Sequence, residues 1–344
     1  MRSRSEVRPG TWHFDYDADR IWFADDPAGH RVETSVARCA FSGEAIDVVI
    51  ATLVIEKYAI PAQMGAIGGQ YPPAGWSIHD CEVRLNHGTG INMGDRWAVS
   101  GCRIQDNGQK GVGGSGRHLR LSACEISRNN FAHFDPGWEA GGAKFGDTVE
   151  LNVLGNRVVG NLGFGLLAEG DVVGARFDGN VVLDNAREGI SSTTASGGVI
   201  VGNEVRRNSR GSSPWMWGAQ ILVRNSSDLE ITGNIVDVAA DGGNAIGLIQ
   251  QECGSGPRGR YLTQRNRVHD NEIIFRGAVG QAGCVADFDQ ASMDAGGNQF
   301  DANRYHMPDT TLAHWGWGGS EVTWTGLRTL GQEANGSIDS ILPP

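Results

Sequence analysis

The sequence is poor in proline, in basic residues and in long apolar segments. Of its 344 residues only 11 are proline, and 29 Lys and Arg stand against 40 Asp and Glu, for a formal net charge of −11. This balance argues against nucleic acid and against an anionic membrane surface as partners. No apolar run reaches the roughly 20 residues of a transmembrane helix, so we expect no membrane insertion. The six cysteines include no Cys-x-x-Cys spacing of a metal site.

What the sequence does contain is a short repeat, with the pattern Cys or Asn, any residue, Val or Ile, two further residues, and Asn. Helical periodicity and the regular Leu-x-Leu of leucine-rich repeats are both absent. Four of the eight steps between successive copies are 21–24 residues and the other four are 27–37 residues, which is typical of a solenoid with loop insertions. The copies begin at Cys81, Cys102, Cys124, Asn156, Asn180, Asn203, Asn234, Asn271 and Asn298.

Each repeat carries three short apolar segments bounded by Gly or Asn. Around Cys102 they are Trp97-Ala98-Val99, Cys102-Arg103-Ile104 and Gly111-Val112. Three short strands per coil predict an all-β fold, a single right-handed parallel β-helix with a cap at each end. Equivalent residues of such coils stack about 4.8 Å apart. We therefore expect Cys81, Cys102 and Cys124 to form a buried column, with the repeated Asn side chains stacked beside it.

The repeat sets the predicted domain boundaries. Residues 46–303 are expected to form the β-helix. Residues 1–45 are predicted to be an N-terminal cap or the remnant of a preceding region, because the end of a solenoid exposes unpaired backbone that must be covered. Residues 304–344, with three Trp, are predicted to be a C-terminal cap or tail. The first residues, Met1-Arg2-Ser3-Arg4-Ser5, are not followed by the apolar segment of a signal peptide.

Over residues 46–303 these repeats resemble the pectate-lyase-like superfamily of right-handed parallel β-helix proteins. Its members include polysaccharide lyases, glycoside hydrolases, C5 epimerases, pectin esterases and phage tailspikes. The resemblance implies a polysaccharide or oligosaccharide partner and favours a secreted or cell-surface location. It does not fix an activity, because one fold supports many functions.

The insertion after Cys124 is the first candidate site, because solenoid loops gather on one face and often build its groove. Aligning Gly94-Asp95 with Gly146-Asp147 places Lys144 at an outward position of its strand, between two inward apolar residues. Glu169 is then its neighbour on the next coil, and Glu188 follows about one coil later. The candidate residues of the insertion itself are His133, Asp135, Trp138, Glu139 and Lys144.

Two reactions suit these groups. Hydrolysis of a glycosidic bond needs two carboxyl groups, which Asp135, Glu139 and Glu169 could supply. Elimination on a uronate needs a base such as Lys144 or His133, and a positive group or Ca²⁺ that two of the carboxylates could hold. In either case Trp138 could stack on a sugar ring. The structural alternative is a salt bridge between Glu139 and Lys144 at the base of an ordinary loop.

Two further insertions interrupt the repeat. The one at residues 210–220 carries Arg210, Trp215 and Trp217, whose aromatic rings suit either sugar stacking or packing onto the barrel. Arg210 could pair with a carboxylate of the substrate or of the protein, and Glu188 is a further candidate for substrate binding. The insertion at residues 250–260 has two Arg but lacks the Gly-Lys-Ser/Thr ending of a phosphate loop.

The segment from Glu139 to Lys144 also resembles a segment of β-helix β-xylosidases, in which the next two coils supply the catalytic carboxylates. Here the matching stretches are Leu166-Leu167-Ala168 and Ile190-Ser191-Ser192, which contain no acid. No catalytic residue is therefore transferred from that family.

The sequence predicts a carbohydrate-active protein that cleaves glycosidic bonds, with hydrolysis favoured because carboxylates outnumber basic residues at the candidate site. One alternative is a polysaccharide lyase that acts by elimination on a uronate-containing glycan. The other is a non-catalytic carbohydrate-binding or surface module. No cofactor is expected, apart from Ca²⁺ if the protein is a lyase, and the sequence leaves the oligomeric state open.

Overall fold

The computed structural model describes residues 3–211 and 215–344, and the chain divides into two compact units, Met1–Val36 and Ala37–Pro344. The first unit contains the short 3-10 helix η1 (Arg4–Glu6) and an antiparallel hairpin of β1 (Trp12–Asp15) and β2 (Arg20–Phe23). The Arg4 guanidinium lies 3.6 Å over the Trp22 ring, which packs the helix onto this hairpin.

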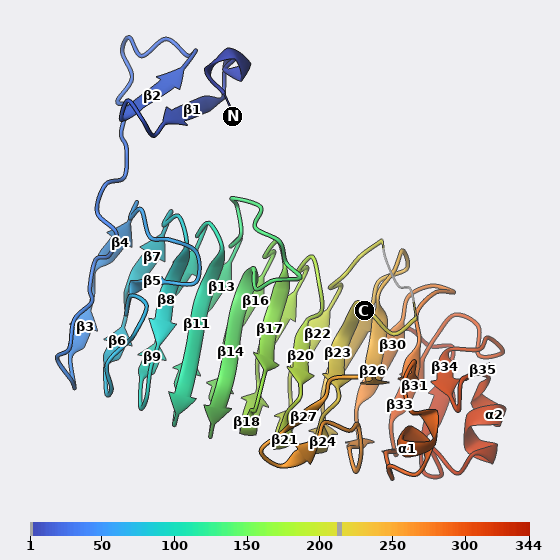
Figure 1. Ribbon diagram of the computed structural model, residues 1–344. Coiled ribbons are helices and arrows are strands. Elements are labelled where there is room, and N and C mark those ends of the chain that lie inside the picture. Colours follow the sequence, from blue (N-terminus) through green and yellow to red (C-terminus); the bar gives the residue numbers. More distant parts are fainter. Residues whose placement is uncertain (1–2, 212–214) are drawn as a thin grey trace. The chain divides into compact units, whose positions relative to one another are not determined.

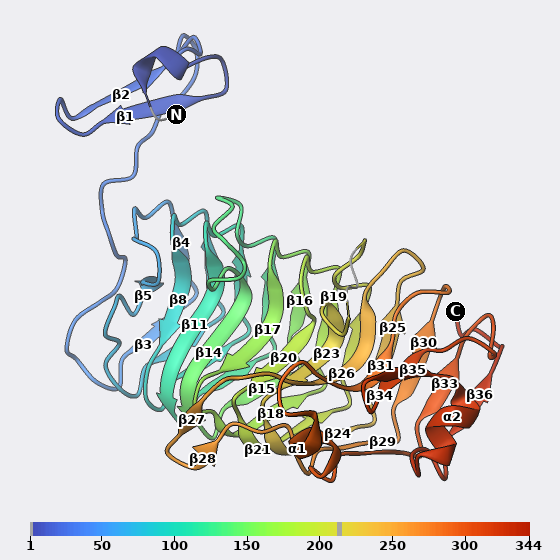
Figure 2. The ribbon, with the colours of Figure 1, turned by 45° about the vertical axis from the view of Figure 1, so that its right-hand side comes forward.

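The second unit is a stack of coils, each of which gives one strand to each of three parallel ladders (Figures 1 and 2). We call the first the groove ladder: β5 (Gly65–Ile67), β8 (Thr89–Met93), β11 (Lys110–Arg117), β14 (Gly141–Val149), β17 (Phe164–Glu169), β20 (Ile190–Thr193), β23 (Ala219–Arg224), β26 (Asn244–Gln250), β31 (Ala282–Ala286) and β34 (Trp315–Trp317).

The second ladder follows it in each coil: β3 (Val49–Ala51), β6 (Ser77–His79), β9 (Ala98–Ser100), β12 (Arg120–Ser122), β15 (Asn152–Leu154), β18 (Val173–Asp178), β21 (Ser196–Val201), β24 (Ser227–Thr232), β29 (Arg267–His269) and β32 (Gln299–Asp301). The third ladder completes the coil: β4 (Val54–Glu56), β7 (Glu82–Arg84), β10 (Arg103–Gln105), β13 (Glu125–Ser127), β16 (Arg157–Val159), β19 (Val181–Leu183), β22 (Glu204–Arg206), β25 (Ile235–Val238), β30 (Glu272–Phe275), β33 (Arg304–His306) and β36 (Ser337–Asp339).

The repeat position of Val or Ile supplies the core. On the third ladder Val83, Ile104, Ile126 and Val158 stack in register, and all four are fully buried. One inward apolar side chain per short strand removes enough surface from water to hold each coil on the next. Among the described residues all six cysteines are free, and Cys81, Cys102 and Cys124 form the predicted buried column.

Two ladders of buried amides stabilise the bends. The first continues the cysteine column: each Asn Oδ1 accepts from the backbone N–H and from the Nδ2 of the Asn one coil before. The second is bonded side chain to side chain in the same direction and runs through Asn86, Asn107, Asn129, Asn161, Asn185 and Asn208. The prediction that Asn298 continues the column after Asn271 is wrong. Asn303 occupies that place, and Asn298 accepts instead from Asn266, because residues 290–297 form the helix α1 (Gln290–Asp294) and a turn that lengthen the coil.

The coils continue almost to the end of the chain. Trp315 of β34 is fully buried, with its ring 5.2 Å from the Tyr305 ring, and β35 (Ser320–Val322) and the helix α2 (Trp324–Thr329) follow it. A small hairpin, β27 (Ser255–Gly256) with β28 (Gly259–Arg260), forms in the third insertion. The domain boundaries at residues 45 and 303 stay predictions. Among the described residues no helix is both long and apolar enough to cross a membrane.

Candidate functional site

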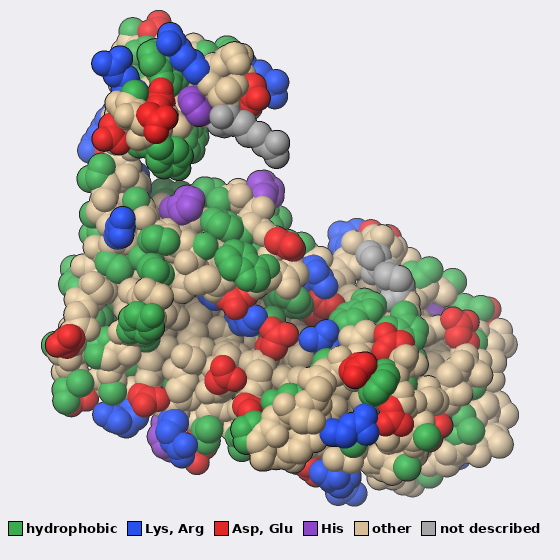
Figure 3. Space-filling view, in the orientation of Figure 1, with side chains coloured by type: hydrophobic (Ala, Val, Ile, Leu, Met, Phe, Trp, Pro, Cys, Tyr) green, Lys and Arg blue, Asp and Glu red, His purple; other side chains and the backbone are tan. Residues whose placement is uncertain are grey.

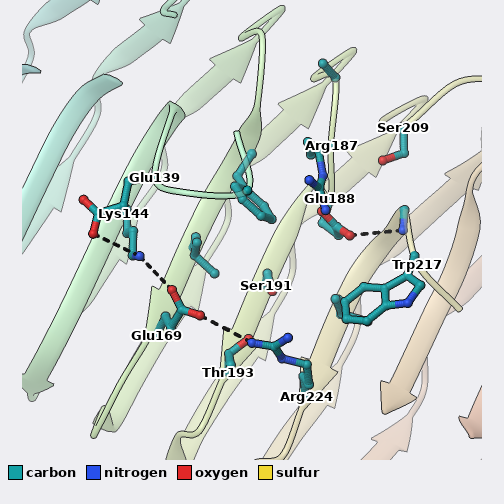
Figure 4. A pocket seen from close by; sticks show the side chains of 16 residues that line it. Glu139, Lys144, Glu169, Arg187, Glu188, Ser191, Thr193, Ser209, Trp217 and Arg224 are labelled. Carbon is teal, nitrogen blue, oxygen red and sulfur yellow. Dashed lines mark hydrogen bonds and ion pairs between the residues drawn. The ribbon is translucent and has the colours of Figure 1, made fainter. Parts of the chain in front are cut away.

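A cavity of about 570 Å³, the first cavity, lies on the outer face of the groove ladder. Along each strand of the groove ladder, alternate side chains point away from the core and toward this outer face. Figure 3 shows acidic and basic side chains interspersed over the middle of this face, and Figure 4 shows the cavity from close by. Its floor consists of two outward rows in register, Lys144, Leu167, Ser191 and Leu222 in one and Glu169, Thr193 and Arg224 in the other.

Lys144 lies where the sequence alignment predicts it. Its strand neighbours Ala143 and Phe145 are buried, and they stack in register on Val112 and Gly114 of the preceding coil. Lys144 itself stacks on Gly113, which has no side chain to cover it. The lysine is therefore free to reach sideways toward the acids of the cavity rather than into solvent.

Five alternating charges follow one another across this face. The Lys110 ammonium lies 2.8 Å from Glu139, and Lys144 lies 3.3 Å from the other oxygen of Glu139 and 2.7 Å from Glu169. Arg224, three strands from Lys144, closes the series at 3.4 Å from Glu169. Because each carboxylate lies between two cations, the charges are largely neutralised within the protein.

This environment changes the pKa values of its members. Burial alone would raise the pKa of Glu139, but Lys110 and Lys144 outweigh it and hold that pKa below its usual value. Burial alone would lower the pKa of Lys144, but the bonds to Glu169 and Glu139 raise it instead. Lys110 is almost completely buried, and desolvation lowers its pKa in spite of Glu139. Glu139 is thus held as an anion and Lys144 as a cation.

Glu188 enters the same cavity from the turn before β20, and its side chain is 1% exposed. One carboxylate oxygen accepts a hydrogen bond from the Gly218 N–H at 3.1 Å, and the other lies 3.4 Å from the Arg187 guanidinium. Arg187 in turn lies 5.0 Å over the Phe164 ring. Figure 4 shows Ser191 between Glu169 and Glu188, with the Trp217 ring beside them.

The structure brings together half of the predicted site residues. Glu139, Lys144, Glu169, Glu188 and Trp217 all line the first cavity. The other five do not: His133, Asp135, Trp138, Arg210 and Trp215.

Those five have other surroundings. His133, Asp135 and Trp138 are exposed on the loop at residues 130–140, where Asp135 accepts from the Gly137 N–H at 2.8 Å. Arg210 pairs with Asp241 at 3.0 Å, and Trp215 lines a different cavity. Residues 212–214 of the same insertion lie outside the described residues.

Sequence reasoning missed three basic groups of the site: Lys110, Arg187 and Arg224. Lys110 lies on the coil before the insertion, and only the register of β11 with β14 brings it under Glu139. Arg224 could have been found by extending the row of Glu169 through Thr193, which it continues one coil later. For Arg187 the sequence offers no indication of a role in the site beyond its position next to Glu188.

No group of three or more His, Cys, Asp or Glu side chains within the described ranges is arranged to hold a metal ion. The oxygens of Glu139 and Glu169 that would serve a cation contact Lys110, Lys144 and Arg224 instead. The positive charges that the described residues place beside these carboxylates are ammonium and guanidinium groups.

A family model described as a right-handed beta helix region matches residues 69–236. No curated protein matches the chain. Among solved structures the chain is similar to XylC in complex with xylose, with a TM-score of 0.62 and 12% identity, over 98% of this chain and 64% of that one. It thus spans less than two thirds of XylC. The Dettilon tailspike protein (gp208) is similar with a TM-score of 0.39 and 13% identity, over 76% of this chain and 62% of that one.

At 12% identity the likeness to XylC concerns the fold alone, and a shared fold leaves the activity open. The three parallel ladders and the matched family model agree on the architecture of a parallel β-helix. The chain therefore has the fold of a right-handed parallel β-helix, and residues 69–236 match the family model of such a region.

Proposed function

We propose that the protein hydrolyses glycosidic bonds of an oligosaccharide or polysaccharide bound in the first cavity. The observation that supports this most directly is the placement of two carboxylates, Glu169 and Glu188, on the wall of one cavity beside the Trp217 ring. Glycoside hydrolysis uses one carboxyl group as acid and a second as base or nucleophile. An indole ring offers the apolar face on which a sugar ring stacks.

The contacts suggest a role for each carboxyl group. Glu169 lies 2.7 Å from Lys144, and this arrangement suits the base or nucleophile. Glu188 accepts from the Gly218 N–H through one oxygen and from Arg187 Nε at 3.4 Å through the other, and it supplies the second carboxyl group that hydrolysis requires. Glu139 is assigned no proton-transfer role, because its lowered pKa makes it unsuited to donate a proton and both of its oxygens contact ammonium groups, of Lys110 and Lys144. Xylose is the sugar bound to XylC, so xylose-containing glycans are the first substrates to test.

Elimination is the second candidate. Arg187 and Arg224 each make only long contacts of 3.4 Å to carboxylates, which leaves donors on both that could bind a uronate. Elimination also needs a base to abstract a proton from the uronate, and neither lysine of the site is suited to this role. The raised pKa of Lys144 keeps it protonated, and Lys110 is buried behind Glu139. Hydrolysis is therefore the better-supported reaction.

The test is product analysis on neutral and uronate-containing glycans. We expect new reducing ends without the absorbance of an unsaturated uronate, and a loss of about 100-fold or more in kcat for Glu169→Gln and Glu188→Gln. Glu125→Gln, on the third ladder away from the cavity, is the matched control. Unsaturated products would establish elimination, binding without cleavage would establish a binding module, and neither binding nor cleavage would reject a carbohydrate function at this site.

A further inference from the structure

The segment at residues 215–218, which we call the Trp loop, is anchored on the outer face of the groove ladder by Met216. Met216 is fully buried there, in an apolar cluster with Leu222, Ile249 and Val285 outside the main core. The ladder leaves room for the Met216 side chain because the strand residue it contacts, Gly316, has no side chain of its own. A Cβ on Gly316 would lie only 2.9 Å from the Met216 side chain.

Polar contacts fix the same loop from below. The buried side chain of Asn244 donates to the backbone carbonyls of Trp215 and Trp217, at 3.1 and 2.6 Å. The Gly218 N–H donates to Glu188. With Met216 buried between them, the two indole rings are held 6.2 Å apart and inclined by 52°. Fixed aromatic rings of this kind bind ligands with little loss of side-chain entropy.

Each ring lines a different cavity. Trp217 lines the first cavity, and Trp215 lines the second cavity, of about 500 Å³, over β26, β31 and β34. Along the outward row, Leu222 of β23 is followed by Gly247, Gly283 and Gly316, so beyond Leu222 this row carries no side chains. The walls are polar: Gln281 Nε2 donates to Glu321 Oε1 at 2.6 Å.

We propose that the second cavity is a further sugar-binding subsite, and that one oligosaccharide extends from the first cavity over the Trp loop into it. The proposal rests on the carbohydrate function proposed above and specifies the ligand as a chain of several sugar units. The two cavities belong to one ladder, and β20 and β31 are three strands apart, or about 14 Å at the usual strand spacing. The two indole rings lie between the cavities, 6.2 Å apart, so a sugar chain that contacts both rings passes from one cavity into the other.

The direction proposed for the sugar chain is toward β34. On the other side of the first cavity Gly137 and Glu139 of the loop at residues 130–140 form the wall. On the side of β34 the second cavity continues past Trp215 to Val279, which is 44% exposed, and to Ser320. An aromatic face with hydrogen-bonding amides and carboxylates beside it is the combination that recognises both faces and edges of a sugar.

The experiment measures the affinity of the full chain for one series of glycans, from disaccharide to hexasaccharide, by calorimetry. Wild type is expected to bind the long members more tightly. Trp215→Ala is expected to weaken binding of the hexasaccharide about tenfold and to leave the disaccharide unchanged, whereas Trp217→Ala weakens both. Glu321→Ala, on the far wall and outside the Trp loop, should repeat the effect of Trp215→Ala. Tyr71→Ala, at a side chain 82% exposed that lines neither cavity, is the control.

The outcomes separate the two proposals. If the disaccharide binds and longer chains gain nothing, the second subsite is rejected and the proposed function stands. If Trp215→Ala weakens both lengths equally, the ring only supports the Trp loop, and the subsite is again rejected. If no member of the series binds or is cleaved, both proposals fail together.

Discussion

The Lys144 ammonium lies 2.7 Å from the Glu169 carboxylate, although the two residues come from neighbouring coils of the groove ladder. The same ammonium lies 3.3 Å from Glu139. Lys144 therefore fixes the position of Glu169, the proposed catalytic carboxylate, and at the same time forms an ion pair with Glu139. Lys144 is a positioning residue in this arrangement, because it acts through Glu169.

Lys144→Met tests this role. Without the ammonium, Glu169 keeps only its longer contact with Arg224, and kcat is expected to fall about 100-fold, the effect of misplacing a reacting group by about 1 Å. KM should change little, and Lys144→Arg should restore a large part of kcat because it keeps a cation between the two acids. Lys57→Met, at an exposed lysine beside Glu56, is the control. Equal losses for the Met and Arg variants would argue that only packing was disturbed.

The ion pairs of Glu139 predict a pH dependence of stability. Its folded-state pKa lies below the ordinary value of 4.5, so the pairs stabilise the fold above that value and lose their effect as the pH falls through the lowered pKa. The free energy of unfolding of wild type, measured with urea, should therefore exceed that of Glu139→Gln at pH 7. The difference should shrink below about pH 4.5. A difference that stays constant from pH 7 to pH 3 would contradict the assignment.

The amide ladder should dominate the stability of the middle coils. Asn161 accepts from the backbone N–H and the Nδ2 of Asn129, and its own Nδ2 donates to Ile126 O and Asn185. Asn161→Ala leaves two buried donors of Asn129 without an acceptor, which should lower the free energy of unfolding by about 2–4 kcal/mol. Asn152→Ala, at a half-buried residue with one long bond to Glu150 O, should change it by less than about 0.5 kcal/mol. Urea unfolding followed by tryptophan fluorescence measures both.

The regular part of this fold was predictable because a period of one coil repeats both the apolar and the amide positions. Register followed from that period, and it placed Lys144 outward and beside Glu169 correctly. The period failed at Asn298, where a helix lengthens the coil and Asn303 takes the ladder position. A regular pattern predicts contacts between equivalent positions and loses them where the chain departs from it.

The candidate site was only partly predictable for the same reason. Glu139 and Lys144 belong to one insertion, but Lys110 and Arg224 reach the site from other coils, 29 and 80 residues from Glu139 and Lys144 respectively. The exposed residues Asp135 and Trp138 looked equally suited by type, and nothing in their spacing shows that the loop turns them away from the cavity. Which face of an irregular loop meets the groove depends on its backbone path, which composition does not determine.

The last prediction concerns Asn244, whose Nδ2 holds the carbonyls of Trp215 and Trp217 and whose Oδ1 accepts from the Gln281 N–H at 2.8 Å. Asn244→Ala removes all three bonds at a fully buried position, so the Trp loop should lose its fixed orientation in both cavities at once. Binding of short and long glycans should then weaken together, by about tenfold, in contrast to the length-dependent loss of Trp215→Ala. Asn335→Ala, at an exposed amide paired with Asp301, is the control and should bind as wild type does. If Asn244→Ala retained full affinity for both lengths, the two rings would be held by Met216 alone, and the polar clamp would have no part in binding.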